Sequence, residues 1–382
     1  MIRPRYDAVV IGARVAGAST AMLLARAGLD VLVVDRAQEG ADTLSTHALM
    51  RGGVMQLARW GVLDAVAAAG TPMISETVFH YGEDTHPVAI RPDGFAAGLY
   101  APRRTVLDGA LVAAARRAGA EVRHRVGLAD LTADRHGRVT GAVLTVDGLP
   151  VEVKADLVIG ADGSTSAVAA AAGAAEPYRT GSNGGTAGVY AYVAGLDPHV
   201  YHWHFVPEAA ASVIPTNDGL ACVGVSVRPD RFRREVRADV PGAWHRLLRQ
   251  VSPALADAVA PAAVGRHRSF PGRRAHFRRS AGQGWALVGD AGHYDDPATA
   301  HGITAALRDA ELLARAVTAG GLASYQAARD ELSDDIFEVT DRVASFDWDL
   351  NALALHHRDL SRAMRAETEA IAAWPARTEA AA

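Results

Sequence analysis

A glycine-bearing turn near the start of the chain restricts its possible folds more than any other feature. Around it the pattern predicts an apolar strand, an amphipathic helix and a second buried strand, over residues 6–12, 15–28 and 29–35. Gly12 permits a tight turn and Gly17 permits close packing of the helix on the sheet, so the helix N-terminus can face a pyrophosphate. Asp35 ends the second strand, where its carboxylate would accept a hydrogen bond from an adenosine ribose. The unit therefore predicts a dinucleotide-binding α/β domain.

One position of this turn departs from the G-x-G-x-x-G pattern, because Arg14 occupies the place of the middle glycine. A side chain there must point away from the phosphates or lie beside them as a cation. Arg36 directly follows Asp35 and is a further expected cofactor contact. The alternative to a dinucleotide site is a tight turn in an ordinary α/β protein.

The composition excludes several classes of protein. The chain has 382 residues, enough for two domains, and 49% of them are hydrophobic. A net charge of −4 without a basic tail gives no reason to expect a nucleic-acid partner. No apolar run reaches the roughly 18 residues of a membrane span, and the start of the chain shows no signal-peptide pattern. We therefore expect a cytoplasmic protein with a small-molecule substrate, as a monomer or a homodimer.

Two rare residue types narrow the chemistry. Cys222 is the only cysteine, which excludes an internal disulfide and a zinc cluster of cysteines. Lys154 is the only lysine and lies in a strand-like run. This placement argues against Schiff-base and pyridoxal-phosphate chemistry.

Two later motifs resemble those of flavoproteins of the para-hydroxybenzoate hydroxylase type. Residues 156–168, which include Asp162 and Gly163, resemble the Asp-Gly motif of that family. Residues 289–293 resemble its Gly-Asp motif. Together with the first turn, the motifs follow the family's order over roughly residues 5–320. The resemblance implies that the cofactor is FAD.

The resemblance also implies roles for residues in and after the Gly-Asp motif. Gly289 and Asp290 end a buried strand, where a flavin ribityl hydroxyl would satisfy the carboxylate. Gly302 and Ile303 open a helix whose positive end would face flavin N1 and the C2 carbonyl, which become anionic on reduction. Pro297 would fix the loop beside the reactive edge of the flavin.

Two arginines match positions near the cofactor in the family. Arg51 begins a helix where an arginine lies near the pyrophosphate. Arg104 belongs to an R-x-x-L element on the adenosine side. The alternative for each is an ordinary surface arginine.

The chain departs from the family at four positions. Ala169 stands where the family usually carries an arginine associated with nicotinamide use, although NAD(P)H is the reductant that the resemblance implies. Ala300, His301 and Thr304 stand where glycine, glutamine and asparagine are common. His301 would lie near the flavin pyrimidine ring, where it would tune the redox potential, meet the substrate or only bind a backbone carbonyl.

The expected fold is an α/β fold: a Rossmann-like FAD-binding domain with an inserted β-sheet substrate domain and C-terminal helices. The FAD-binding domain is discontinuous and comprises residues 1–74, 100–180 and 268–335. The substrate domain comprises residues 75–99 and 181–267. Residues 336–382 supply the C-terminal helices.

Within the substrate domain, alternation over residues 201–205 places the aromatic side chains on one face and His202 and His204 on the other. If the histidine face meets the flavin, the pair would bind or deprotonate a phenolic or enolic substrate. The alternative is that the histidines face solvent while the aromatic side chains form the core. A His-x-His strand can also ligate a metal, but the sequence places no third ligand, so no metal is expected.

His47, shortly before Arg51, is the leading candidate for a catalytic or substrate-orienting side chain, with His301 and Pro297 as the other catalytic candidates. Tyr190 and Tyr192 would line the same pocket or only stabilise a sheet.

These expectations combine into an FAD-dependent monooxygenase. NAD(P)H would reduce the flavin, O₂ would add at C4a, and the hydroperoxide would transfer one oxygen to an electron-rich aromatic, phenolic or polyketide-like substrate. The first alternative is an FAD-dependent reductase of isoprenoid or quinone double bonds, which shares the motifs. Others are a halogenase, whose active-site lysine and W-x-W-x-I-P element have no full counterpart here, and a flavin-binding protein without turnover. Substrate, regiochemistry, electron donor and oligomeric state stay open at this point.

Overall fold

The computed structural model describes residues 2–196 and 199–375, and a large sheet within it is built around the strand before the glycine turn. β1 (Arg5–Ile11) lies between β2 (Val31–Asp35) and β10 (Leu149–Gly160), all parallel. β7 (Glu121–His124) and β19 (Trp285–Leu287) extend the parallel part on either side. Antiparallel strands complete the sheet: β8 (Val126–Ala133), β9 (Val139–Val146) and β18 (Ala281–Gly282).

Helices cover one face of the large sheet, and β8, β9 and α5 cover the other, so its central strands are apolar on both faces. α1 (Val15–Arg26) packs between α4 (Arg104–Arg117) and α9 (Gly302–Thr318), and α5 (Ala167–Ala171) lies against β8 and β10. The sequence pattern predicts one helix over residues 52–69, but the structure has two in this stretch, α2 (Arg51–Arg59) and α3 (Leu63–Ala68). The break falls at Gly61, whose φ of +68° ends a helix without the strain that a side chain would bring.

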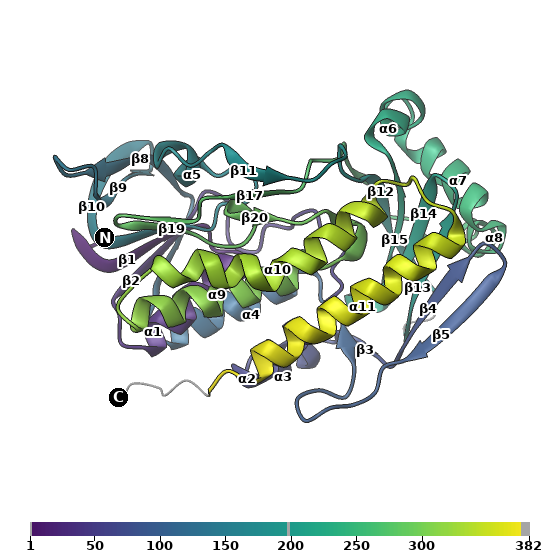
Figure 1. The fold of residues 1–382 in the computed structure, drawn as a ribbon, viewed down its shortest axis with the longest axis horizontal. Coiled ribbons are helices and arrows are strands. Elements are labelled where there is room, and N and C mark those ends of the chain that lie inside the picture. Colours follow the sequence, from purple (N-terminus) through teal and green to yellow (C-terminus); the bar gives the residue numbers. More distant parts are fainter. Residues whose placement is uncertain (1, 197–198, 376–382) are drawn as a thin grey trace.

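A second, seven-stranded sheet lies at the other end of the molecule (Figure 1). Its strands come from two separate stretches of the chain, residues 76–89 and 187–270. In spatial order they are β16 (Arg268–Phe270), β12 (Ala187–Ala194), β15 (Leu220–Val227), β14 (Ala209–Pro215), β13 (Val200–Val206), β4 (Glu76–Tyr81) and β5 (Asp84–Ala89). β16 pairs with β12, so the strand lies in this sheet although residues 268–335 were assigned to the FAD-binding domain.

One face of the second sheet is covered by three helices that the sequence pattern did not reveal: α6 (Pro229–Glu235), α7 (Val240–Val251) and α8 (Pro253–Val259). We call this the outer face. The opposite, inner face turns toward the helices of the large sheet. Small sheets join the two parts: β11 (Pro177–Thr180) with β17 (His276–Arg278) and β20 (His293–Tyr294), and β3 (Met73–Ile74) with β6 (Leu99–Tyr100).

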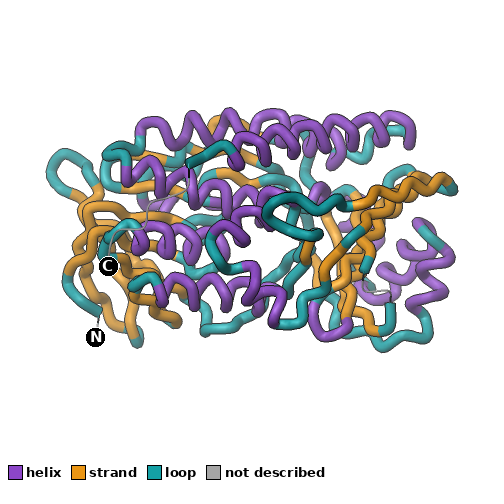
Figure 2. The backbone as a smooth tube through the Cα atoms, turned by 90° about the horizontal axis from the view of Figure 1, so that it is seen from below, coloured by secondary structure: helices purple, strands orange, loops and turns teal. Residues whose placement is uncertain are grey.

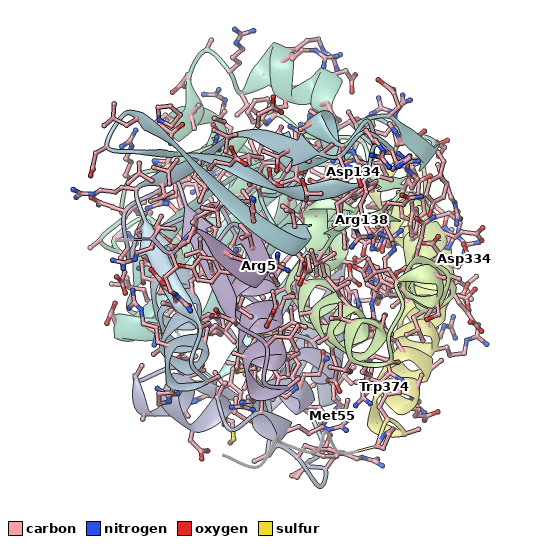
Figure 3. The ribbon with its side chains drawn as sticks, turned by 90° about the vertical axis from the view of Figure 1, so that its left-hand side faces the viewer. Arg5, Met55, Asp134, Arg138, Asp334 and Trp374 are labelled. Atoms are coloured by element: carbon pink, nitrogen blue, oxygen red, sulfur yellow. The ribbon has the colours of Figure 1, made fainter. Side chains whose placement is uncertain are left out.

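Two long C-terminal helices connect the ends of the molecule. α10 (Ala323–Ala344) and α11 (Leu350–Ala372) pack on each other, and α11 runs from the second sheet to α2 (Figure 1). Viewed from below, strands gather at the two ends and helices fill the middle (Figure 2). Arg59 donates to the carbonyls of Ile371 and Trp374, and Trp374 lies at the same lower edge as Met55 (Figure 3).

The observed architecture confirms the predicted α/β fold with a separate antiparallel sheet and C-terminal helices. Among the described residues, no helix combines the length and the apolar character that a bilayer span requires.

Candidate functional site

The glycine turn after β1 has the geometry that close packing requires. Gly12 has φ +109°, and a Cβ built there would lie 2.3 Å from the carbonyl oxygen of Ala161. A Cβ on Gly17 would lie 1.8 Å from the carbonyl oxygen of Gly12. Asp35 Oδ2 accepts a 2.8 Å hydrogen bond from the amide of Ala13. The turn is therefore fixed by backbone contacts and by the Asp35 carboxylate, which retains lone pairs for a ribose hydroxyl.

Arg14 and Arg104 meet at one buried carboxylate, Asp108. Arg104 lies one turn before Asp108 on α4 and donates to its Oδ1 at 3.0 and 3.1 Å. Arg14 Nη1 lies 3.9 Å from Asp108 Oδ2, too far for a hydrogen bond. Burial raises the pKa of Asp108 and the two arginines oppose that shift. With two cations and one carboxylate, the group carries a net positive charge beside the N-terminus of α1 when Asp108 is ionised.

The Asp-Gly motif forms a turn held by its aspartate. Asp162 accepts hydrogen bonds from the Ser166 hydroxyl at 2.5 Å and from the Ala167 amide at 2.6 Å. Gly163 has φ +82°, which favours glycine. Asp162 therefore shapes the turn before α5. Its expected contact with the cofactor stays a prediction. Ala169 is fully buried in α5, so an arginine at this position would require repacking.

The Gly-Asp motif places Asp290 directly beside the start of α9. Gly289 has φ +61°, and a Cβ there would lie 2.9 Å from the Cβ of Ala16 on α1. Burial raises the pKa of Asp290 to about 6, opposed by the charge of Arg104. Nothing lies within 4 Å of a Cβ built on Gly302, the first residue of α9. Space therefore remains at this helix N-terminus, where a partly anionic ring would be stabilised.

The loop between the Gly-Asp motif and α9 is held by two local features. Pro297 begins a short 3₁₀ turn (Pro297–Thr299), and Asp296 caps it through the amide of Ala298. Ala300 follows in the left-handed region with φ +54°. The family's usual glycine at this position thus matches a backbone conformation that this chain forms with alanine.

His301 is buried beside a carboxylate of the last helix. Its side chain is 1% exposed, and its Nε2 lies 2.9 Å from Oε2 of Glu367 on α11. Glu367 also accepts a 2.7 Å hydrogen bond from Arg308, which in turn binds Asp309 at 2.8 Å. Burial raises the pKa of Glu367, but the charges of His301 and Arg308 outweigh that effect and lower it. The partner of His301 is thus a carboxylate and not a backbone carbonyl, while redox tuning and substrate contact stay predictions for this side chain.

Arg51 begins α2 as expected, but its guanidinium is engaged by the loop after β5. It pairs with Asp93 and donates to the carbonyl of Arg91 at 2.7 Å. Arg36 is exposed at the end of β2. The expected pyrophosphate contact of Arg51 would therefore require its side chain to leave Asp93.

His47 and Tyr192 form a buried pair where the large sheet's domain meets the inner face. His47 Nε2 and the Tyr192 hydroxyl are 2.6 Å apart, and the Arg103 guanidinium lies 3.9 Å above the Tyr192 ring. Burial, with the charges of Arg104 and Arg103, lowers the pKa of His47 to about 3, while burial raises that of Tyr192 well above its usual range. The imidazole is therefore neutral, and its Nε2–H tautomer can donate a hydrogen bond to the Tyr192 oxygen, which leaves the phenolic proton free for another acceptor. His47 also has φ +67°, a strained conformation that is common at functional positions.

Tyr190 lies beside this pair on the inner face of β12, with its ring centroid 5.7 Å from that of Tyr192. His202 and His204 lie on the other side of the sheet. Their partners in β14 are Val213 and Ala211, which pack against the outer helices. The expectation that these histidines meet a substrate at the flavin is wrong for this reason, whereas both tyrosines lie on the side that faces the cofactor-binding domain.

Several features of the assembled site fit FAD. Within residues 2–196 and 199–375, Arg14 Nη1 and His47 Nδ1 are buried without a hydrogen-bond partner. A phosphate would satisfy the arginine, and a bound ring or substrate would satisfy the histidine. Open space lies beside Gly302 at the start of α9, where a side chain would meet no atom within 4 Å. The residues present therefore fit a dinucleotide with a flavin at the start of α9.

Three residues of the candidate site were not predicted from the sequence: Asp108, Arg103 and Glu367. Asp108 had a detectable signal, because it lies four residues after Arg104 in a predicted helix. Arg103 directly precedes Arg104 but approaches Tyr192, a residue from the other sheet. Glu367 lies on the last helix, and only tertiary packing brings it to His301.

Comparisons with known proteins agree with this geometry. The model of the family described as FAD binding domain matches residues 5–335. The chain is 29% identical over 388 residues to digeranylgeranylglycerophospholipid reductase of Methanothrix thermoacetophila, covering 94% of this chain and 93% of that protein. It is 27% identical over 350 residues to menaquinone reductase of Mycolicibacterium smegmatis, covering 85% and 79%.

Solved structures share the fold at lower identity. A flavin-dependent brominase superimposes with a TM-score of 0.81 and 18% identity over 97% of this chain and 96% of that chain. A probable FAD-dependent monooxygenase from Pseudomonas aeruginosa gives a TM-score of 0.72 and 21% identity, over 96% and 100%. The motif resemblance is thus confirmed: this chain belongs to the FAD binding domain family and is an FAD-dependent oxidoreductase.

Proposed function

We propose that this protein is an FAD-dependent reductase that saturates a carbon–carbon double bond in an isoprenoid chain or a quinone. This was the first alternative to a monooxygenase. The names of the relatives that match most of the chain specify a digeranylgeranyl lipid and menaquinone as compounds reduced. The likeness to a brominase and a monooxygenase lies below 25% identity and supports only the fold.

The proposal rests mainly on Tyr192, a protonated tyrosine on a sheet face that has no charged side chains. The inner-face positions of β12 to β15 carry no charged side chain: Gly188, Tyr190, Tyr192, Ala194, Tyr201, Trp203, Phe205, Ala210, Ser212, Ile214, Leu220, Cys222, Gly224 and Ser226. The part beside His47, with Tyr190 and Tyr192, would suit a hydrocarbon substrate and exclude water. Elsewhere this face packs against α10 and α11 through Trp203, Phe205 and Ala210. Beside His47, Tyr192 keeps its proton across the physiological pH range.

The chain's own residues would supply the proton for this reduction. Reduced FAD, when bound, supplies a hydride equivalent to one carbon of the double bond. Tyr192 would donate its hydroxyl proton to the other carbon, and His47 would hold the hydroxyl in position through its 2.6 Å contact. The Arg103 guanidinium above the ring would stabilise the tyrosinate that forms. Solvent protons would then restore the hydroxyl between turnovers.

The proposal is tested by the mass of the product. Purified, FAD-loaded protein, reduced with dithionite without oxygen, would be incubated with a geranylgeranyl lipid or with menaquinone. We expect a product that gains two hydrogens per double bond and no oxygen. A product that gains one oxygen atom, and forms only when O₂ is admitted, would instead support the monooxygenase.

The reductant in the cell is part of the same proposal. Ala169 occupies the position of the nicotinamide-associated arginine and is buried, so we infer that a carrier other than free NAD(P)H reduces this flavin. Anaerobic mixing with NADPH and NADH should leave the oxidised flavin spectrum largely unchanged within a turnover time. Rapid bleaching by either nucleotide would contradict this inference.

A further inference from the structure

Three histidines from two strands converge on the outer face of the second sheet. His202 and His204 alternate along β13, and His80 lies opposite His204 on β4. Figure 1 shows β4 next to β13. In the strand order of the sheet, both lie toward the end opposite β16. The ligand nitrogens of the three rings all lie within 4.8 Å of one another, and each ring is half-buried. The flavin chemistry described above uses none of these side chains.

We propose that His80, His202 and His204 form a binding site for one divalent transition-metal ion of the Zn²⁺ class. Imidazole nitrogen is a preferred ligand of Zn²⁺, Cu²⁺, Ni²⁺ and Co²⁺, whereas Mg²⁺ and Ca²⁺ prefer oxygen. Three histidines with an open fourth position for water form a recognised type of zinc centre. The sequence alone offered two of the ligands, and the fold supplies the third.

The distances between the imidazole nitrogens are close to those that one bound ion would require. Zn–N bonds of about 2.0–2.1 Å place tetrahedral ligand nitrogens roughly 3.4 Å apart. His80 Nε2 and His202 Nδ1 already lie 3.1 Å apart, and the rings of His80 and His204 stack with centroids 4.1 Å apart and planes 5° from parallel. All three ligand nitrogens already lie within 4.8 Å of one another, so only a small displacement would bring His204 to the spacing that a tetrahedral ion requires.

A neighbouring hydroxyl orients one of the ligands. His80 Nδ1 lies 3.1 Å from Oγ1 of Thr85, which lies opposite His80 on β5. If Nδ1–H donates to this oxygen, the lone pair of His80 is on Nε2, the atom that faces His202. Histidine ligands of metals commonly donate their other ring N–H in this way, which fixes the tautomer.

A metal ion at this site would also link two distant stretches of the chain. An ion here would tie residues 76–81 to residues 200–206, which meet in the sheet although more than a hundred residues separate them in sequence.

The test compares zinc binding by the full-length, FAD-loaded protein and by matched variants, all without a polyhistidine tag. Metal-free wild type should take up one Zn²⁺ per chain by calorimetry and keep it through gel filtration. His80→Ala should weaken Zn²⁺ binding at least about 100-fold, and Thr85→Val about 10-fold. The control is His86→Ala, because His86 pairs with Phe79 on β4 and so points to the inner face. It should bind Zn²⁺ as wild type does.

Folding is monitored by FAD content, because the flavin site lies on the other side of the sheet. His80→Ala should keep full FAD content while it loses the rise in Tm that Zn²⁺ gives the wild type. Zinc uptake that is equal in His80→Ala and His86→Ala, or absent in wild type, would overturn the proposal. If His80→Ala loses FAD, His80→Gln and Thr85→Val supply the same comparison with smaller changes.

Discussion

Tyr192 is the residue on which the proposed chemistry most depends. Replacing it by phenylalanine removes the hydroxyl 2.6 Å from His47 and keeps the ring under Arg103. We expect turnover to fall about 100-fold or more, the usual contribution of a general acid, with FAD content unchanged. Tyr201→Phe is the matched control on the same face, because that hydroxyl is buried without a partner among the described residues. Equal turnover in both variants would show that Tyr192 is not the proton donor.

Asp290 is expected to destabilise the FAD-free protein while it strengthens FAD binding. Its folded pKa of about 6 exceeds the ordinary value of 3.8, so its charge destabilises the FAD-free fold above pH 6. This penalty disappears as the pH falls below about 4, so the wild type gains stability from this group on acidification. Asp290→Asn should raise the unfolding free energy of FAD-free protein at pH 8 by about 1–2 kcal/mol and weaken FAD binding.

The check is urea unfolding of both FAD-free proteins at pH 8 and pH 5, with FAD titration alongside. The stability gap between variant and wild type should narrow at pH 5. A variant that is less stable than wild type at pH 8 would refute the burial argument.

Ala300 adopts a conformation that costs an alanine about 1–2 kcal/mol relative to glycine. Ala300→Gly relieves that strain but adds freedom to the unfolded chain, so a net gain of up to about 1 kcal/mol is expected. Ala298→Gly, two residues earlier in the 3₁₀ turn and without a positive φ, should destabilise instead. Urea midpoints measure both, and a loss of stability in Ala300→Gly would contradict this account.

At the scale of elements, α11 is held to α9 by a buried charge network. Glu367→Gln leaves Arg308 and His301 without their shared carboxylate and should destabilise the protein by about 3 kcal/mol. Glu369→Gln, an exposed change on the same helix, should stay within about 0.5 kcal/mol. Chemical unfolding at pH 7 makes the comparison.

The same network has a predicted pH signature. The folded pKa of Glu367 lies below its ordinary value of 4.5, so its stabilisation is present at neutral pH. This stabilisation is lost as the pH falls below about 4.5. The unfolding free energy of the wild type should therefore decrease more steeply with acidification than that of Glu367→Gln. Parallel acid-unfolding curves for the two proteins would argue against an ionised Glu367.

Elements with strong local signals could be predicted from the sequence. The first strand–turn–helix unit, the strand before Asp290 and helix α9 all show clear periodicity or glycine placement. Helices α6 and α8 were missed because they have seven residues each, whereas α7 has a helical spacing of apolar residues that could have been recognised: Ala243, Trp244, Leu247, Leu248 and Val251. The predicted helix over residues 52–69 was too long because Gly61 has no local marker of its positive φ.

For the molecule as a whole, the sequence could not orient the second sheet. Alternation in β13 separates aromatic from histidine side chains, but it does not show which face meets the cofactor-binding domain. Only the strand pairing of the folded protein shows the orientation. His202 lies opposite Val213, whose face packs against the outer helices, and β13 pairs with β4. His47 and Tyr192 were both expected near the flavin, yet their 2.6 Å contact joins residues 145 positions apart.

We propose that reduced FAD in this protein passes its electrons to a carbon–carbon double bond and not to oxygen. The most direct measurement is anaerobic stopped-flow mixing of the dithionite-reduced protein with a geranylgeranyl lipid or menaquinone. For menaquinone, whose ring oxygens also accept two electrons, the two added hydrogens must be found on carbon. We predict that the oxidised flavin spectrum returns without O₂, at a rate that Tyr192→Phe lowers about 100-fold. A flavin that stays reduced with each substrate and reoxidises only when O₂ is admitted would contradict this proposal.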